Sequence, residues 1–365
     1  MPERKIKVLV VDDSMVNRKT VAELLRADPR IEVVGTATDP YMARDKILEL
    51  EPDVMALDTE MPKMDGITFL KILMKQHPMP VVAMTPQSKT GSRLALGALE
   101  AGAVDVVMKL ASDVFSVESG PELIAKIMAA ANPDERAAKG LPISSLQTPA
   151  SSPRATPTRL PEGVIKYHPK QVILLGASTG GTEALRDVLM QLPGDMPGIC
   201  IVQHIPEDFS GPFAERLNSV SALEVREAKD GDHVRPGLVL IAPGDLHMTI
   251  HKRSPEGFYV QVRPGEKHGH HRPSVDLLFQ SAAAIMGARA VAGLLTGMGR
   301  DGADGLLALR QAGARTFAQD EQSCVVFGMP RAAMEIGAAE KMVPLPNIAP
   351  HIMRLASIAA ASKPD

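Results

Sequence analysis

The chain has 365 residues, of which 45% are hydrophobic and 23% are charged, and its formal net charge is −3. This length is sufficient for two domains with separate cores, and the composition is that of an ordinary globular protein. The small negative charge and the absence of tryptophan argue against a nucleic-acid partner, and no excess of basic residues favours an anionic membrane.

Residues 6–130 alternate short β-rich runs with helical patterns. Strands are expected at 7–11, 32–37, 54–57, 81–84 and 104–108. Helices are expected near 15–27, 40–50, 66–76, 91–101 and 121–131. Continuous apolar strands separated by helices predict a five-stranded parallel sheet covered on both faces. The functional groups of such a sheet gather at the carboxyl ends of its strands.

The segment 132–163 has a different composition from the rest of the chain. It contains six prolines and several serines and threonines, and it has no apolar periodicity. These features predict an extended, mobile linker. The linker would separate an N-terminal domain of residues 1–131 from a C-terminal domain of residues 164–365.

The α/β alternation resumes after the linker. Strands are expected at 172–177, 198–204, 238–242, 290–296 and 314–318, with a hairpin within 248–262. Helices are expected at 181–191, 210–218, 275–286, 302–312 and 329–339. The pattern predicts a second, doubly wound and mostly parallel α/β domain with a helical C-terminus.

Five polar residues of the N-terminal domain lie at the ends of predicted strands. They are Asp12, Asp13, Asp58, Thr85 and Lys109. Clustered carboxylates repel one another unless a cation lies among them, and oxygen ligands suit Mg²⁺. A lysine and a hydroxyl beside an aspartate can stabilise a phosphoryl group on it. Capping of a strand end would explain any one of these residues, but five at the correct positions favour a site.

This domain resembles a response-regulator receiver, most clearly in the run LDTEMPKMDG at 57–66. The resemblance implies that Asp58 accepts phosphate from a histidine kinase. It also implies that Asp13, Asp58 and the backbone carbonyl of Glu60 hold Mg²⁺. Supporting roles fall to three further residues: Asp12, Thr85 and Lys109.

Two positions depart from the usual receiver pattern. Val106 stands where receivers carry tyrosine or phenylalanine, and Leu110 stands where they carry proline after the lysine. Val106 has no aromatic ring, and the Lys109-Leu110 peptide bond is expected to be trans. We therefore expect phosphorylation to persist, but its coupling to the C-terminal domain to weaken.

The C-terminal domain places a serine, a histidine and an acid just after predicted strands. Ser178 lies in Gly176-x-Ser-x-Gly180, which formally matches the nucleophile elbow of α/β-hydrolases. His204 and Asp301 follow two other strands. Serine becomes a nucleophile when an imidazole held by a carboxylate takes its proton. Alone, a Gly/Ser turn is more often structural, and the order Ser–His–acid differs from that of α/β-hydrolases.

Two other motifs in this domain suggest alternative functions. Residues 297–302 fit the dinucleotide pattern G-x-G-x-x-G, with Asp320 at a suitable distance beyond, but Asp301 and Asp304 would repel a pyrophosphate. The cluster HGHH at 268–271 could hold a metal, although a solvated loop near a cleft is the preferred interpretation. A receiver joined to a non-catalytic dinucleotide sensor therefore stays open as an alternative. A receiver-driven transcription factor lacks a basic recognition helix.

The C-terminal domain also resembles the catalytic domain of chemotaxis protein-glutamate methylesterases. Several runs carry the resemblance: ILLGASTGG at 173–181, QHIP at 203–206, RPSVD at 272–276, LTGMGRDGADG at 295–305 and GMP at 328–330. It implies that Ser178 is the nucleophile, His204 the general base and Asp301 the orienting acid. Backbone N–H groups near Met298 are candidate oxyanion donors.

The resemblance implies an activity and its setting. The expected activity is hydrolysis of glutamyl methyl esters on methylated chemoreceptors, with glutamine deamidation and no cofactor for either reaction. The expected partners are those receptors and the histidine kinase of a chemosensory array. Cys200 and Cys324 have no metal-type spacing, which favours a reducing cytoplasm, and no apolar run approaches the ~20 residues of a membrane span.

Overall fold

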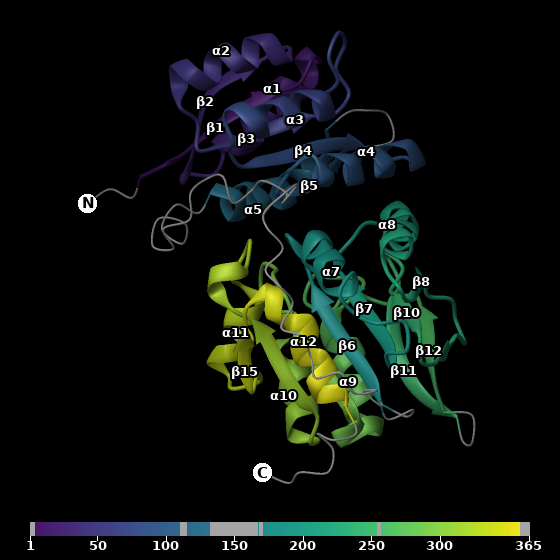
Figure 1. The fold of residues 1–365 in the computed structure, drawn as a ribbon. Coiled ribbons are helices and arrows are strands. Elements are labelled where there is room, and N and C mark those ends of the chain that lie inside the picture. The colour runs from purple at the N-terminus through teal and green to yellow at the C-terminus, as the bar shows by residue number, and fades with distance from the viewer. Residues whose placement is uncertain (1–3, 110–114, 132–166, 168–170, 254–256, 358–365) are drawn as a thin grey trace. The chain divides into compact units, whose positions relative to one another are not determined.

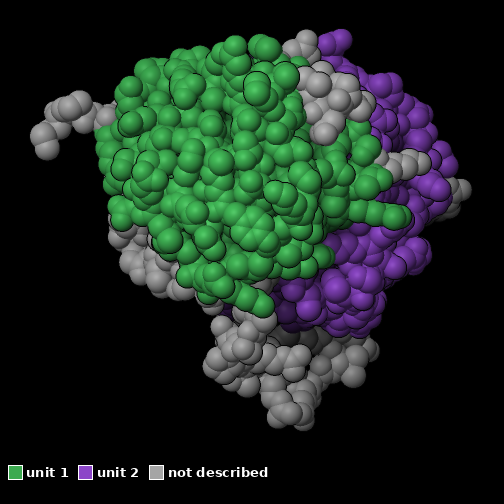
Figure 2. All heavy atoms as spheres, turned by 90° about the horizontal axis from the view of Figure 1, so that it is seen from above, with its two compact units in different colours: residues 1–153 green, residues 154–365 purple. Residues whose placement is uncertain are grey.

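The computed structural model describes residues 4–109, 115–131, 167, 171–253 and 257–357 (Figure 1). The chain divides into two compact units, residues 1–153 and 154–365 (Figure 2). The division falls within the segment 132–163, which lies outside the described residues. The linker and the domain limits at 131 and 164 therefore stay predictions. Of the described helices, none is long and apolar enough to cross a membrane.

The first unit contains a five-stranded parallel sheet in the order β2-β1-β3-β4-β5. Its strands are β1 (Ile6–Val11), β2 (Ile31–Ala37), β3 (Val54–Asp58), β4 (Val81–Pro86) and β5 (Asp105–Lys109). Its helices are α1 (Met15–Arg26), α2 (Pro40–Leu50), α3 (Gly66–Gln76), α4 (Lys89–Glu100) and α5 (Gly120–Ala131). The predicted five-stranded parallel fold is confirmed.

Local sequence explains where the helices of this unit begin. Ser14, Asp39, Asp65 and Ser88 precede α1, α2, α3 and α4, and each accepts a hydrogen bond from a backbone amide of the first turn. The intervening strands are apolar; every residue of β3 is buried. α1 packs against α5, and α3 packs against α4. Because the capped helices begin soon after the buried strands end, short loops connect the two.

The second unit contains a seven-stranded parallel sheet in the order β15-β14-β13-β6-β7-β10-β8. Its strands are β6 (Val172–Ala177), β7 (Gly198–Gln203), β8 (Glu224–Glu227), β10 (Leu238–Ile241), β13 (Ala290–Leu294), β14 (Arg315–Gln319) and β15 (Lys341–Val343). The edge strands β8 and β15 were not predicted from the sequence. They are only four and three residues long and contain charged residues, so they lack the apolar pattern of the central strands.

The predicted hairpin forms a sheet of its own. β11 (His247–Arg253), β12 (Gly257–Arg263) and β9 (His233–Val234) pair antiparallel in the order β11-β12-β9. The helices of this unit are α7 (Gly181–Leu189), α8 (Glu207–Val220), α9 (Val275–Met286), α10 (Ala303–Gln311), α11 (Met329–Glu335) and α12 (Leu345–Ala356). α9 packs against both α10 and β11, so it joins the small sheet to the body of the unit.

The order of the strands determines where a site can form. The chain passes from β6 to β7 on one side and later returns to β13 on the other side of β6. The loops after β6, β7 and β13 therefore diverge at a topological switch point, the usual position of a ligand site in open α/β sheets.

Candidate active site

The three residues predicted to act together follow the three strands at this switch point. Ser178 follows β6, His204 follows β7, and Asp301 lies in the loop between β13 and α10. Strand register aligns Ala177 with Gln203, and the amide of His204 donates to the carbonyl of Ala177 at 3.0 Å. Ser178 and His204 are therefore the next residues along two hydrogen-bonded neighbouring strands.

The backbone of Ser178 is held on several sides. Its amide donates to the carbonyl of Thr296 at 3.0 Å, and its carbonyl accepts from the Gly181 amide at 2.7 Å and the Gln203 side chain at 2.8 Å. Gly297 packs directly on it, since a Cβ at that position would lie 2.7 Å from the Ser178 Cβ. The half-buried Ser178 thus lies in a tight turn between β6 and α7.

His204 and Asp301 form a direct pair. Nε2 of His204 lies 2.7 Å from Oδ2 of Asp301, and the two side chains are 10% and 3% exposed. Nδ1 of His204 is buried and has no hydrogen-bond partner among the described residues. With one nitrogen engaged by the acid, Nδ1 is the nitrogen that remains to exchange a proton with a reacting group.

The start of α9 holds the carboxylate of Asp301. Ser274 Oγ donates to Oδ1 at 2.8 Å, the Val275 amide to Oδ2 at 2.7 Å, and the Asp276 amide to Oδ1 at 3.1 Å. Burial opposes ionisation, but the hydrogen bond from His204, its charge and these donors hold the pKa of Asp301 well below its usual range. Asp301 is an anion at the positive end of α9.

The helix that follows Asp301 begins without a side-chain cap. Gly302 is the N-cap of α10 and makes no side-chain capping bond. The hydrogen bonds of the Asp301 carboxylate go to His204 and to α9. Asp301 thus contacts the histidine and the start of another helix, which favours the orienting role.

The acids of the dinucleotide pattern are engaged locally. Asp304 pairs with exposed Arg300 at 2.7 Å. Asp320 follows β14 and accepts from the Ser323 amide at 3.1 Å, which caps a short 3₁₀ turn. Asp301 lies at the turn where a pyrophosphate would bind and is itself anionic. These contacts favour the histidine-orienting role over a dinucleotide site.

Met298 directly follows Gly297, which packs on Ser178. The carbonyl of Gly297 accepts from the amides of Gly328 and Met329 at 3.0 and 2.9 Å, which fixes the backbone at this point. Within the described ranges, no backbone acceptor takes the amide of Met298. The amide of Met298 therefore stays a candidate oxyanion donor.

His271 was missed as a site residue by the sequence analysis. His268 and His270 are exposed, but His271 is half-buried, and its ring stacks on His204 with centroids 3.8 Å apart. Among the described residues, these histidines do not form a group that could hold a metal ion. The one sequence signal that could have distinguished His271 is its position directly before the run RPSVD at 272–276.

The structure brings the acidic residues of the first unit together. Oxygens of Asp12, Asp13 and Asp58 lie within 4.8 Å of one another. Nζ of Lys109, which is fully buried, lies 2.7 Å from Asp58 and 3.2 Å from Asp12. Burial raises the pKa of Asp58 to about 7, although Lys109 opposes the shift. This donor set fits Mg²⁺, which binds carboxylate oxygens.

The remaining receiver positions have less direct geometry. The Glu60 amide donates to Asp58 at 3.2 Å, which places that backbone beside the acid cluster. The buried Thr85 donates its hydroxyl to Met108 Sδ at 3.0 Å. Val106 is buried in β5, and Leu110 lies outside the described residues, so the expected trans bond after Lys109 stays a prediction.

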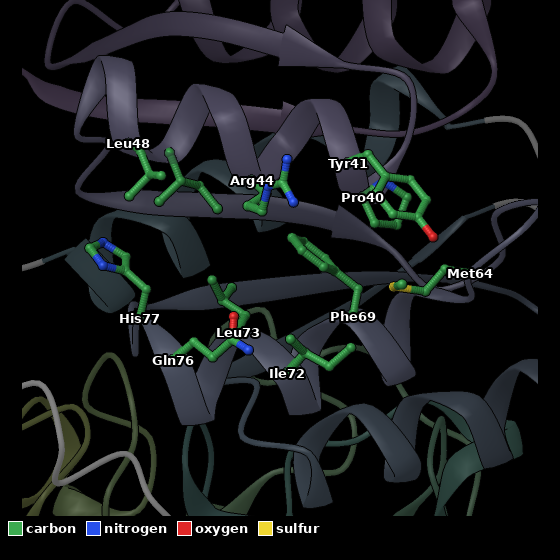
Figure 3. Close-up of a pocket in the computed structure, with 11 residues that line it drawn as sticks. Pro40, Tyr41, Arg44, Leu48, Met64, Phe69, Ile72, Leu73, Gln76 and His77 are labelled. Carbon is green, nitrogen blue, oxygen red and sulfur yellow. The ribbon is translucent and has the colours of Figure 1, made fainter.

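The first unit also has a groove of about 460 Å³ between α2 and α3. Figure 3 shows Tyr41, Leu48, Phe69 and Ile72 on its walls, with His77 at one end. None of the predicted site residues lines this groove. Its walls are mostly apolar, and the polar side chains among them belong to Tyr41, Arg44, Gln76 and His77.

The fold and these two sites define a receiver domain joined to an α/β domain of hydrolase type. Residues 8–115 match the response regulator receiver domain, and residues 173–352 match CheB methylesterase. A protein-glutamate methylesterase/protein-glutamine glutaminase from Syntrophus aciditrophicus is 48% identical over 96% of this chain and 99% of its own length. The chain therefore belongs to the CheB methylesterase family.

Other relatives agree with this assignment. A protein of the same name from Anaeromyxobacter dehalogenans is 49% identical over 96% of this chain and 97% of its own length. The crystal structure of the CheB methylesterase catalytic domain of Thermotoga maritima is 37% identical. It superposes with a TM-score of 0.50 and covers 51% of this chain and 98% of that one.

Proposed function

We propose that this protein hydrolyses γ-glutamyl methyl esters on chemoreceptors and deamidates receptor glutamines under the control of phosphorylation. The observation that carries the proposal is the His204–Asp301 pair beside Ser178 at the switch point of the sheet. The high identity to proteins named protein-glutamate methylesterase/protein-glutamine glutaminase supports the choice of substrate.

The reaction follows from the placement of these groups. Ser178 Oγ attacks the ester carbonyl while His204 Nδ1 takes its proton, and the Met298 amide donates to the oxyanion. His204 then gives this proton to the departing methoxide, which leaves as methanol. Water attacks the acyl-enzyme while His204 takes its proton and returns it to Ser178 Oγ, and the receptor regains a glutamate carboxylate. A glutamine follows the same steps, with ammonia as the leaving group.

Asp301 contributes by remaining ionised throughout. Its hydrogen bond fixes the edge of the imidazole that carries Nε2, and its charge stabilises the imidazolium that forms when Ser178 loses its proton. The three donors from α9 hold the carboxylate in place, so it does not reorganise during the reaction.

The receiver supplies control. A histidine kinase of a chemosensory array transfers phosphate to Asp58. Asp13, Asp58 and the Glu60 carbonyl would hold Mg²⁺, and Asp12 would support the site. A bound ion would supply positive charge that offsets the negative charge of the phosphoryl group. Thr85 and Lys109 contact the phosphoryl oxygens. Phosphorylation then shifts the population between an inhibited and an active arrangement of the two domains.

The decisive experiment is methanol release from membranes that carry methylated receptors, with and without a small phosphodonor. We expect release that increases when the phosphodonor is present. We place the protein in the cytoplasm, where such receptors expose their methylated helices. A dinucleotide sensor would instead show no methanol release and a higher melting temperature with saturating NAD(P), and that result would replace this proposal.

A further inference from the structure

The imidazole of His271 lies flat on that of His204. Their centroids are 3.8 Å apart, and their planes differ by 6°. The hydrogen bond from His204 Nε2 to Asp301 fixes one edge of the ring but leaves it free to turn about that bond. A parallel ring at van der Waals distance opposes this turn. The two contacts together fix both the edge and the plane of the base.

His271 is itself held in place by its backbone and its neighbours. Its amide and carbonyl form hydrogen bonds of 2.9 and 3.0 Å with the backbone of His268. The next residue, Arg272, binds the Asp245 carboxylate through two nitrogens at 2.9 and 2.6 Å. Hydrogen bonds thus hold the segment from which the ring of His271 projects.

The same short segment also holds the acid. Ser274, Val275 and Asp276 donate to the Asp301 carboxylate. Residues 271–276 therefore contact the base through a ring and the acid through three donors. The segment 271–276 therefore keeps the side chains of His204 and Asp301 in a fixed position relative to each other.

We propose that His271 is a positioning residue of the esterase, which holds the His204 imidazole, as a neutral stacked ring, in the plane needed to take the proton of Ser178. This inference rests on the proposed function. It adds a fourth side chain to the Ser178–His204–Asp301 mechanism, one that acts through His204 and does not touch the substrate.

The surroundings of His271 favour its neutral form. Burial, followed by the charge of His204, lowers its pKa to about 4; His270 and Lys267 act in the same direction, and Asp301 opposes them. A neutral ring tolerates the imidazolium that forms on His204 during the reaction. A fixed cation in the same place would repel that imidazolium and impede proton uptake.

Four variants of the full-length protein test the proposal. His271→Ala removes the ring, His271→Phe keeps a neutral flat ring, and His271→Arg adds a permanent charge. His268→Ala is the matched control, because its exposed side chain lies in the same loop. Two rates are measured: methanol release from methylated receptors, and labelling of Ser178 by a fluorophosphonate, which needs the base but not the receptor.

We expect His271→Ala to lower kcat and the labelling rate by ~10–10²-fold with KM unchanged, the usual effect of a misplaced catalytic group. His271→Phe should recover most of this loss, and His268→Ala should match the wild type. His271→Arg should move the acidic limb of the kcat/KM profile to lower pH, because a nearby cation disfavours protonation of His204.

Labelling and kcat of His271→Ala within twofold of the wild type would overturn the inference. So would equal losses in the alanine and phenylalanine variants with no change in pH profile, which indicate a purely structural role. If the alanine variant does not fold, the comparison of phenylalanine with arginine decides. Wild-type protein that is labelled but releases no methanol contradicts the proposed function, while the labelling rates still test His271.

Discussion

Replacing Asp301 by asparagine tests the centre of the proposed mechanism. Each carboxylate oxygen accepts two hydrogen bonds: Oδ1 from Ser274 Oγ and the Asp276 amide, and Oδ2 from the Val275 amide and His204 Nε2. An asparagine amide group must place its NH₂ at one of these positions. In either orientation, an N–H of α9 then faces another donor and loses its acceptor.

The two orientations have different consequences for the base. With NH₂ at the Oδ2 position, His204 must accept through Nε2 and carry its proton on Nδ1, the tautomer that cannot take a proton from Ser178. With NH₂ at the Oδ1 position, the tautomer survives, but the negative charge that stabilises the imidazolium is lost. We expect kcat to fall by ~10⁴-fold, as in a serine protease triad with the same change.

The same substitution should also destabilise the fold. A buried N–H without an acceptor costs about 1–3 kcal/mol. For a domain of this size, that loss lowers Tm by about 2–12 °C. Ser274→Ala is the matched control, because it removes one donor to Asp301 and the N-cap of α9 but keeps the carboxylate. Ser274→Ala should lower the free energy of unfolding by about 0.5–2 kcal/mol. It should lower kcat far less than Asp301→Asn does, because the carboxylate keeps its charge, its bond to His204 and two backbone donors.

The assay is kcat for methanol release, combined with Tm by calorimetry on the same preparations. A kcat for Asp301→Asn within tenfold of the wild type would refute the orienting role. The pH dependence gives a second check. The pKa of Asp301 is lower in the folded state than its ordinary value of 3.8. Its ionisation therefore stabilises the fold at any pH above 3.8, and this contribution is lost as the pH falls through the lowered pKa. The difference in unfolding free energy between wild type and Asp301→Asn should therefore narrow in acid.

Three further predictions concern the nucleophile and the receiver. Ser178→Ala should abolish methanol release while Tm stays near that of the wild type, because a small side chain fits the turn; residual turnover within tenfold of wild type would remove Ser178 from its role. Deletion of residues 1–131 should raise basal esterase activity, since a tethered inhibitory domain acts at high effective concentration; a fragment no faster than unphosphorylated full-length protein would mean that the receiver acts by recruitment. Val106→Tyr combined with Leu110→Pro should increase the activation ratio at equal Asp58 occupancy, because it restores the ring and the proline of the usual receiver; an unchanged ratio would show that the switch does not use these two positions.

Much of the fold was predictable because its signals are local. The apolar runs of β1, β3, β4, β6, β7 and β13 are continuous, and Ser and Asp residues mark the starts of several helices. The edge strands β8 and β15 escaped prediction because their pairing depends on neighbouring strands and not on their own short, partly charged sequences. Pairing of that kind is a long-range property.

For the candidate site, the sequence by itself determined which residues follow the strands. Ser178, His204 and Asp301 could be chosen because parallel strands bring their carboxyl ends to one edge. Only the tertiary structure decided what their side chains contact. The sequence suggested Asp301 as the partner of a histidine, and the structure adds that its carboxylate also accepts a hydrogen bond from the start of α9. His271 is almost seventy residues from His204 in the chain, and its stacking depends on how the loop before α9 folds back. No local pattern encodes such a contact, because packing between distant segments sets it.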